Sequence, residues 1–443
     1  MPFRCIVMGA AGRDFHDFQV FLRDRPEFRV VAFTAAQIPF IERRSFPREL
    51  AGPGYGEDLP IFPESELPRL LRELEVDFAF LCYSDLAHEE VMHKASLVQA
   101  AGAGFALLGP RHTQLRSRLP VVAVVAVRTG AGKSPITQML ARHLAGRGRR
   151  VAVLRHPMPY GDLRRQAVQR FAAEADLDRA ECTIEEREEY QPYLESGLPI
   201  FAGVDYRAVL AAAEREAEVV LWDGGNNDYP FVRPDLSIVV ADALRPGHEV
   251  GYHPGETNLR SADVVVVNKV SEAAPGAVAE VRRHAAALAP GAPVLEGDLV
   301  ISVERPEAIA GRRGVAVEDG PTVTHGGMAF GAATVAARRC RAREILDPRP
   351  FAVGTIADAF RAFPHLGPVL PALGYSEAQR RDLGETIDRC GAEVVVDGSP
   401  ARLDRLLALR VPAVRVGYAF EQRSGPPLAG LVEAALRRRG RGP

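Results

Sequence analysis

The sequence lacks the features that mark several large classes of protein. Its five cysteines are scattered without a C-x-x-C pair, which argues against a zinc site and against a disulfide framework. No apolar run is long enough to cross a membrane, and the amino terminus has no signal-peptide pattern. We therefore expect a cytoplasmic protein.

Excess charge is also missing. The formal net charge is −2, so no bulk positive field draws the chain to nucleic acid or to an anionic membrane. Lysine is scarce and arginine dominates the basic residues; high-GC coding can explain this, so it is weak evidence for oxyanion binding. With 47% hydrophobic residues the composition is that of a globular protein. A chain of 443 residues exceeds one compact core, so we expect two or three α/β domains.

One stretch carries the strongest functional signal. Residues Val121 to Val127 are all apolar and mostly β-branched, the pattern of a strand buried on both faces of a parallel sheet. In the turn that follows, glycines let backbone N–H groups point at a phosphate, a lysine adds charge and a serine hydroxyl can ligate Mg²⁺. A helix with an apolar face begins there, so phosphate would sit at a helix N-terminus. The alternative is a chance glycine turn. The turn reads Arg128-Thr129-Gly130-Ala131-Gly132-Lys133-Ser134.

The turn departs from the full phosphate-loop pattern at one position, because Val127 stands six residues before the lysine where that pattern has glycine. It resembles the shortened Thr-Gly-x-Gly-Lys-Ser loop of the P-loop branch that includes dethiobiotin synthetase and nucleotide-dependent metallochaperones. Downstream, Val219 to Trp222 form an apolar strand that delivers Asp223 at its end. This is the form of a Walker B strand, so Ser134 and Asp223 are the predicted Mg²⁺ ligands. An ordinary strand ending in an Asp-Gly turn is the alternative for Asp223.

A third nucleotide signal is incomplete. The string Asn268-Lys269-Val270-Ser271 resembles the guanine-reading Asn-Lys-x-Asp element, but Ser271 replaces the aspartate that would accept hydrogen bonds from guanine. A base-reading carboxylate is absent unless Glu272 substitutes. We still expect Asn268 and Lys269 to flank a purine, and we favour ATP over GTP.

The order of apolar segments predicts an α/β protein of three units. Residues 1–115 alternate strands and helices as in a small Rossmann-like doubly wound sheet. Residues 120–320 are predicted to form a larger parallel P-loop NTPase sheet, with its last strand at 314–317, and residues 321–443 a C-terminal α/β unit. The first strand ends in Gly9-Ala10-Ala11-Gly12-Arg13, which lacks G-x-G-x-x-G spacing. It is either a phosphate-binding turn or a tight turn without a ligand.

Three polar loops follow predicted strands of the second unit, at the edge where ligands bind in open α/β sheets. They cover 155–163, 225–228 and 245–260, and the first is expected to lead into a helix carrying Gln166, Gln169 and Arg170. Any of these loops could instead be a solvated turn. The acidic run from Asp176 to Tyr190 is most simply a solvated helix face.

Taken together, six strings in this order resemble the cyclic 2,3-diphosphoglycerate synthetase family over essentially the whole chain. The strings are residues 8–16, 128–134, 155–163, 222–228, 253–258 and 324–328. The resemblance implies an ATP-dependent ligase that converts 2,3-diphosphoglycerate into an intramolecular cyclic diphosphate, with ADP and phosphate as the other products. One substrate phosphate would attack the γ-phosphorus of ATP, and the other would then close the ring and expel phosphate. The resemblance also implies a homodimer with Mg²⁺, and K⁺ is a further candidate ion.

The anionic reaction determines which residues are candidates for the site. Lys133, Arg128, Arg155 and His156 are assigned to the transferring phosphoryl group, and the backbone from Thr129 to Ser134 to the ATP phosphates. Asp162 is a predicted loop organiser or outer-shell metal group, because an ionised phosphate nucleophile needs no strong base. The candidate ligands of the substrate are Arg13, His16, Tyr160, Arg170, His253, Asn258, His325 and Arg349.

Two other classes stay open from the sequence. A nucleotide switch or metallochaperone would need a purine-reading aspartate and a metal-binding cysteine or histidine cluster, and neither is visible. A P-loop GTPase, ATPase or phosphotransferase that acts on another di-anionic metabolite would keep every feature described above.

Overall fold

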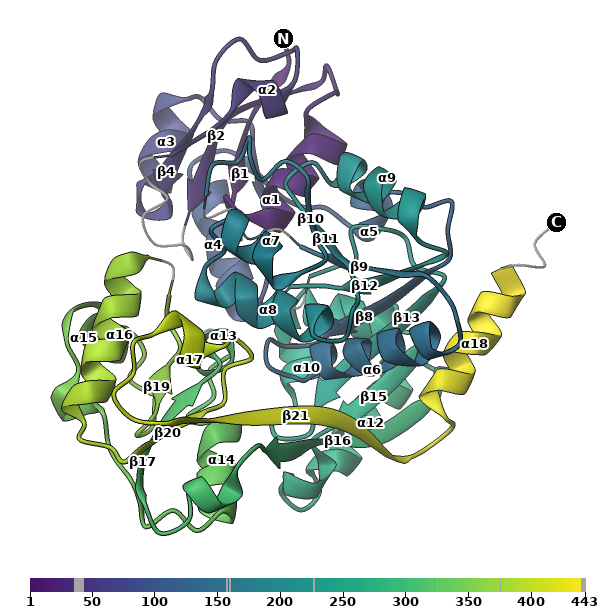
Figure 1. Cartoon of the computed structure of the whole chain (residues 1–443). Helices are drawn as coiled ribbons and strands as arrows, with labels where there is room; N and C mark the ends of the chain where they lie inside the picture. The colour runs from purple at the N-terminus through teal and green to yellow at the C-terminus, as the bar shows by residue number, and fades with distance from the viewer. Residues whose placement is uncertain are drawn as a thin grey trace.

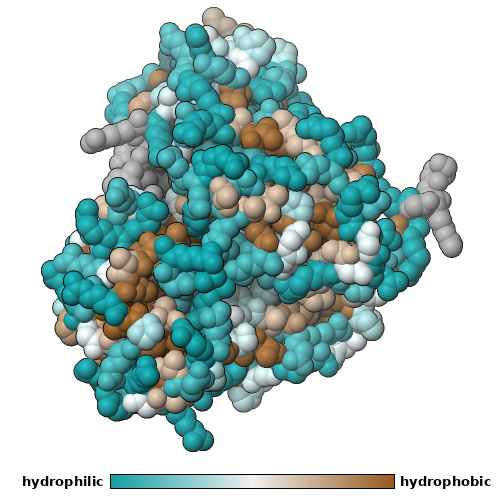
Figure 2. Space-filling model, in the orientation of Figure 1, coloured by the Kyte–Doolittle hydropathy of each residue, from teal (hydrophilic) through white to brown (hydrophobic). Residues whose placement is uncertain are grey.

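The computed structural model describes residues 1–35, 44–156, 158, 161–225, 228–324, 326–374 and 376–439. It contains three α/β units, of which the first lies at the top of Figure 1, the second in the centre and the third at the lower left. The predicted α/β class with parallel sheets is confirmed. On the face shown in Figure 2 hydrophilic side chains predominate, with hydrophobic residues in small groups between them. Among the described residues no helix has the length and hydropathy needed to cross a membrane.

The first unit is built on a six-stranded sheet. Its elements are β1 (Phe3–Met8), α1 (Gly12–Asp17), η1 (Phe18–Leu22), β2 (Phe28–Ala35), β3 (Ser45–Phe46), α2 (Arg48–Ala51), β4 (Leu59–Pro63), η2 (Glu64–Glu66), α3 (Leu67–Glu73), β5 (Phe78–Leu81), β6 (Leu86–Ala87), α4 (His88–Ala100), β7 (Gly104–Leu107) and α5 (Pro110–Thr113). The strand order is β3-β4-β2-β1-β5-β7. Because β2 and β5 flank β1 on opposite sides, the turn after β1 lies at the topological switch point, where α/β sheets bind ligands.

The second unit carries the P-loop. Its elements are β8 (Val121–Ala126), α6 (Lys133–Gly146), β9 (Val151–Arg155), β10 (Gln169–Phe171), α7 (Glu174–Arg179), α8 (Ile184–Leu194), β11 (Ile200–Ala202), α9 (Tyr206–Glu216), β12 (Val219–Asp223), β13 (Leu236–Asp242), α10 (His248–Gly251), β14 (Tyr252–His253), α11 (Gly255–Arg260), β15 (Val264–Asn268), η3 (Val270–Glu272), α12 (Ala277–Leu288) and β16 (Val294–Val303). The strands run in the order β10-β11-β9-β12-β8-β13-β15-β16. Helices cover both faces, so the central strands are buried throughout and consist mostly of valine.

The third unit continues the same sheet. Its elements are η4 (Pro306–Ala308), β17 (Arg313–Glu318), α13 (Gly320–Val323), α14 (Ala332–Arg339), β18 (Glu344–Ile345), η5 (Arg349–Phe351), α15 (Gly354–Ala362), β19 (Leu370–Pro371), α16 (Glu377–Arg389), β20 (Val394–Asp397), α17 (Leu403–Leu406), β21 (Ala413–Ser424) and α18 (Leu428–Arg439). The long antiparallel pair of β16 and β21 joins the two units into one 13-stranded sheet. Helix α18 then returns to the second unit (Figure 1), where Leu428, Val432 and Leu436 enter its core.

Two sequence-based assignments of strands and helices are wrong. The strand predicted at 314–317 is β17, but it pairs with β18, β19 and β20 of the third unit instead of closing the second sheet. The helix predicted to carry Gln169 and Arg170 is the edge strand β10, antiparallel to β11. The edge of β11 offers unpaired backbone groups to this segment, and Phe171 is buried against Tyr190 with ring centroids 4.9 Å apart.

Candidate functional site

The phosphate loop connects β8 to α6. Gly130 and Gly132 have φ angles of 78° and 98°, in the left-handed region that favours glycine. A Cβ atom on Gly132 would lie 2.3 Å from the side-chain nitrogen of Asn268. Both the backbone conformation and the close packing therefore require glycine at this turn.

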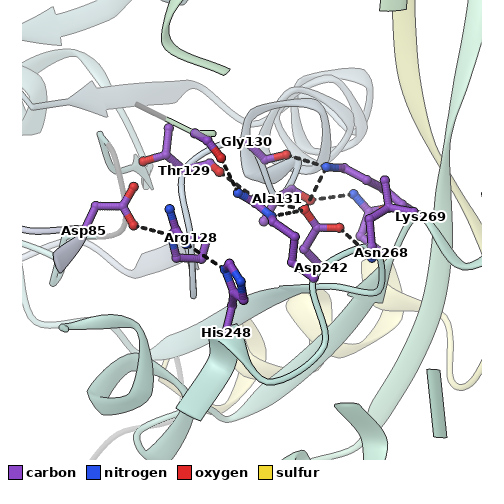
Figure 3. A network of polar contacts seen from close by, with 12 residues as sticks. Asp85, Arg128, Thr129, Gly130, Ala131, Asp242, His248, Asn268 and Lys269 are labelled. Atoms are coloured by element: carbon purple, nitrogen blue, oxygen red, sulfur yellow. Dashed lines mark hydrogen bonds and ion pairs between the residues drawn. The ribbon is translucent and has the colours of Figure 1, made fainter. Parts of the chain in front are cut away.

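Three side chains stabilise the loop by donating hydrogen bonds to its backbone carbonyls. Arg245 Nη2 donates to the Thr129 carbonyl at 2.7 Å, Lys269 Nζ to the Gly130 carbonyl at 2.6 Å and Asn268 Nδ2 to the Ala131 carbonyl at 2.9 Å (Figure 3). These consecutive carbonyls are engaged by cationic and amide donors, and the Ala131 N–H donates to the Arg128 carbonyl at 3.3 Å. The other N–H groups of the loop can therefore face an anion. Asn268 and Lys269, predicted to bind nucleotide, thus contact the loop itself.

Asp242, at the end of β13, forms ion pairs with two of these three side chains, Arg245 and Lys269. Its carboxylate lies 2.8 Å from Arg245 and 2.9 Å from Lys269. Burial would raise the pKa of Asp242, but Lys269 and Arg245 outweigh it and keep that pKa below its usual value. The carboxylate is therefore ionised at neutral pH and fixes both cations behind the loop.

Arg128, the first residue of the loop, connects it to the first unit. Its Nε donates to Asp85 at 2.6 Å, its Nη1 lies 2.6 Å from His248 Nδ1, and its guanidinium is 3.7 Å from the Tyr252 ring centroid. Figure 3 shows Arg128 between Asp85 and His248. Burial and the nearby Arg128 lower the pKa of His248 to about 4, so this histidine is neutral and accepts the hydrogen bond. Arg128, predicted to stabilise the transferring phosphoryl group, is occupied as an anchor between units.

The Walker B strand ends inside a buried ionic network. Asp223 is fully buried and accepts hydrogen bonds from Tyr193 at 2.6 Å and from Ser134 at 3.3 Å. Arg155 Nη1 lies 2.6 Å from the same carboxylate, and its Nη2 pairs with Glu189. Arg155 thus reaches the site from β9 with both its Nη groups engaged.

Ser134 and Asp223 fit an Mg²⁺ ion of the kind held mainly by substrate phosphates and water. Their oxygens are 3.3 Å apart at the end of the loop, and such an ion takes only one or two protein ligands. Within the described part of the chain no three His, Cys, Asp or Glu side chains gather as a metal cage. Arg155 contacts the same carboxylate, so it would share Asp223 with the ion.

A cavity of about 230 Å³ opens beside the loop, between the second and third units. Lys133, Ser134 and Lys269 line one side of it. Burial, and then the nearby Arg155, lower the pKa of Lys133. Carboxylates also line the cavity: Glu188 and Glu189 from α8, Glu318 and Asp319 at the end of β17, and Glu272 and Asp298.

The prediction of a solvated acidic face is wrong for the part of the run in α8, whereas Asp178 and Glu181 upstream are exposed. Glu185, Glu186 and Glu188 are between 1% and 5% exposed because α8 lies against the third unit. The Gly374 N–H donates to Glu185 at 2.9 Å, and the Ser399 hydroxyl donates to Glu188 at 2.6 Å. Burial raises the pKa of Glu185 to about 8. No local signal distinguishes this helix from a solvated acidic one, because its partners lie some 200 residues later in the chain.

Several predicted substrate residues meet at the junction of the first and second units. Arg13 is buried, with Nε 3.6 Å from Asp17 and Nη1 4.0 Å from Asp228. His156 Nδ1 lies 3.2 Å from Asp228, a carboxylate that the sequence analysis did not single out. Asn258 donates to the carbonyls of Ala126 and Asp228 at 3.4 Å. His253 joins the junction through its carbonyl, which accepts from Asp85 N–H at 2.9 Å.

Other predicted residues lie away from the cavity. His16 Nε2 donates to the Thr113 carbonyl at 2.7 Å and stacks on Phe231, and burial lowers its pKa to about 3. Arg170 pairs with Glu216 at 2.7 Å, and Arg349 with Asp347 at 2.6 Å, on the surface. Tyr160 and His325 lie outside the described residues. The loop, Ser134, Asp223 and Arg155 are therefore brought together, whereas Arg170 and Arg349 are not.

The chain resembles known proteins over very different spans. It is 53% identical to arginine synthetase ArcE of Thermococcus kodakarensis over 97% of this chain and 96% of that protein. It is 35% identical to a tetraacyldisaccharide 4′-kinase of Anaeromyxobacter sp. over 41% of this chain and 49% of the kinase. Among solved structures, LpxK of Aquifex aeolicus in complex with ATP gives a TM-score of 0.41 at 11% identity, over 79% of this chain and 95% of that one. No protein-family model matches the chain.

Proposed function

The chain belongs to the family of arginine synthetase ArcE, and from that premise we propose that it is an ATP-dependent synthetase that forms arginine. The observation that carries the proposal is the near full-length identity to that enzyme. The phosphate loop supports it, because its carbonyls are tied back by Arg245, Lys269 and Asn268 and its N–H groups are available to ATP phosphates.

The chemistry follows from what a phosphate loop can do. Arginine differs from a ureido amino acid such as citrulline by one nitrogen in place of the ureido oxygen. Transfer of the γ-phosphoryl group to that oxygen breaks the bond to ADP and makes the oxygen a leaving group. Ammonia then attacks the carbon, the carbon–oxygen bond breaks, inorganic phosphate leaves and a proton is lost. The sum is ureido amino acid, ammonia and ATP giving arginine, ADP and phosphate.

In this proposal each loop residue has a role. Lys133 and the N–H groups of the loop bind the β- and γ-phosphates and offset the charge that builds up during transfer. Ser134 and Asp223 would hold Mg²⁺, which would supply positive charge against the charge of the phosphates. Arg155 keeps the Asp223 carboxylate in place through its 2.6 Å contact.

The second candidate is the cyclisation of 2,3-diphosphoglycerate, which the six sequence strings favour. A substrate with about five negative charges needs several cationic side chains to bind it. The basic residues predicted for that task are largely engaged: Arg128 with Asp85, Arg155 with Asp223 and Arg13 near Asp17 and Asp228. Carboxylates also line the cavity beside the loop. Both features support the arginine-forming reaction over the cyclisation.

One experiment separates the two candidates. The purified protein is incubated with ATP and Mg²⁺ and either citrulline with ammonium or 2,3-diphosphoglycerate, and products are followed by phosphorus NMR and amino-acid analysis. We expect arginine, ADP and phosphate to appear together in the first mixture, with Lys133→Ala lowering the rate by roughly 100-fold or more. Lys94→Ala is the matched control, because Lys94 pairs with Glu64 in the first unit, in another part of the chain. A cyclic diphosphate signal without arginine would replace the first candidate by the second.

A further inference from the structure

Two carboxyl groups that line the cavity, those of Glu188 and Asp319, form no ion pair among the described residues. Glu188, which is 5% exposed, accepts one hydrogen bond from Ser399, and its second oxygen has no partner. Asp319 accepts hydrogen bonds from Thr322, of which the one from the N–H measures 3.4 Å, and Lys133 acts on it by longer-range attraction. Throughout the described residues no lysine, arginine or histidine forms an ion pair with either carboxylate. Burial and then the proximity of Asp319 raise the pKa of Glu188 well above its usual value.

Other acidic groups near the cavity are already satisfied. Glu318 accepts hydrogen bonds from the Ala333 and Thr334 N–H groups at 2.9 and 2.8 Å, so it caps the start of α14. Glu189 is paired with Arg155. Glu272 pairs with Arg339 and Asp298 with Arg423. Apart from Glu318, the lining carboxyl groups without an ion pair among the described residues are therefore Glu188 and Asp319. Burying a carboxylate without a cation is costly, and a cation held in the cavity would offset that cost.

The cavity also determines what kind of cation fits. Lys133 and Ser134 line the same cavity as Glu188 and Asp319, so a group bound there would lie beside the phosphate loop. Met328 and Val335 line the same cavity and offer apolar contact to an aliphatic chain. A guanidinium on an alkyl stem matches both, because its planar donors suit carboxylates. Mg²⁺ has a better place at Ser134 and Asp223.

We propose that Glu188 and Asp319 bind the guanidinium group of arginine and, in the forward direction, surround the ureido carbon while it gains positive charge. The proposal rests on the proposed function and deepens it, because it names the residues that select a guanidinium over an anionic substrate. Stabilising charge that develops during the reaction favours the transition state over the neutral ureido substrate. Both residues lie where α8 meets the third unit, so this unit supplies half of the substrate site.

The test compares Glu188→Gln and Asp319→Asn with Glu385→Gln, a change on an exposed position of α16. Binding of arginine in the presence of ADP, Mg²⁺ and phosphate is measured by titration calorimetry, together with the binding of ADP alone. We expect the first two variants to raise the Kd for arginine tenfold or more with little change for ADP, the loss typical of one charge-assisted hydrogen bond. Gln can still accept the Ser399 hydroxyl, so Glu188→Gln should melt no lower than the parent without ligand.

The outcomes separate this inference from the proposed function. Unchanged arginine affinity in both variants, while the protein still makes arginine, overturns the inference alone. A raised Mg²⁺ requirement with unchanged arginine affinity also overturns it, since Glu188 and Asp319 would then bind the metal ion instead of the guanidinium group. If no arginine is made, binding of methylguanidine is measured instead. Weaker binding to Glu188→Gln than to the parent protein supports the guanidinium site and shows that only the proposed reaction is wrong.

Discussion

At the residue scale, the phosphate loop depends on one amide more than on any other neutral side chain. Asn268 donates to the Ala131 carbonyl and fills the space that a Cβ atom on Gly132 would need. Asn268→Ala removes this brace and leaves a buried carbonyl without its partner, at a cost of about 1–3 kcal/mol. We expect the KM for ATP to rise by roughly tenfold while the KM for the second substrate changes little.

The control for this residue is Ser271→Ala, three positions further along the same segment. Ser271 donates to Asp298 and does not contact the loop. The KM for ATP is measured by steady-state kinetics at varied ATP concentration. Equal KM values for Asn268→Ala and the parent protein would show that Arg245 and Lys269 suffice to hold the loop in shape.

At the element scale, helix α10 binds Arg128 through a neutral histidine, His248. The pKa of His248 is lowered to about 4 by burial and Arg128, against about 6.5 in an unfolded chain. The unfolded state therefore binds this proton more readily, so stability is lost as pH falls from about 6.5 to about 4. Asp85, Asp242 and Arg245 are the other charged groups near this ring. We expect His248→Gln to lose less stability than the parent between pH 7 and pH 5.

Urea unfolding followed by the fluorescence of Trp222, the single tryptophan, measures this difference. Trp222 is fully buried in the Walker B strand, so its emission reports on the second unit. The same comparison for His93→Gln, an exposed histidine on α4, is the control. Parallel pH profiles for His248→Gln and the parent would mean that folding does not lower the pKa of His248.

At the scale of the whole molecule, the second and third units share one sheet and one core. The β16–β21 pair joins them, and α18 places Leu436 and Val432 in the core of the P-loop unit after the chain has crossed the third unit. Leu436→Ala should cost about 2–5 kcal/mol. We expect it to lower the midpoints of the Trp222 fluorescence and far-UV circular dichroism transitions together. Arg438→Ala, exposed on the same helix, should shift neither. A circular dichroism transition that splits from the fluorescence transition would instead mean that the third unit unfolds independently.

The sequence by itself predicted the elements whose cause is local. The valine-rich strands at 121–127 and 264–267 match β8 and β15 closely because a strand buried on both faces needs an unbroken apolar run. The glycine turn before Lys133 was predictable because left-handed φ angles favour glycine. Ser134 and Asp223 were predictable together because both follow strands that end at the same edge of the sheet.

Only the tertiary structure decided the rest, because the deciding partners lie far apart in the chain. Glu188 is buried by Ser399 and the third unit, 211 residues later, and no spacing within α8 reveals this. Arg128 has the chemistry of a phosphate ligand, yet Asp85 and His248 engage it 43 and 120 residues away. Likewise β17 joins β20 because the long β16–β21 pair carries the sheet into the third unit. Local pattern determined most of the buried strands and the glycine loop before Lys133; long-range packing determined which charges are engaged and which line the cavity.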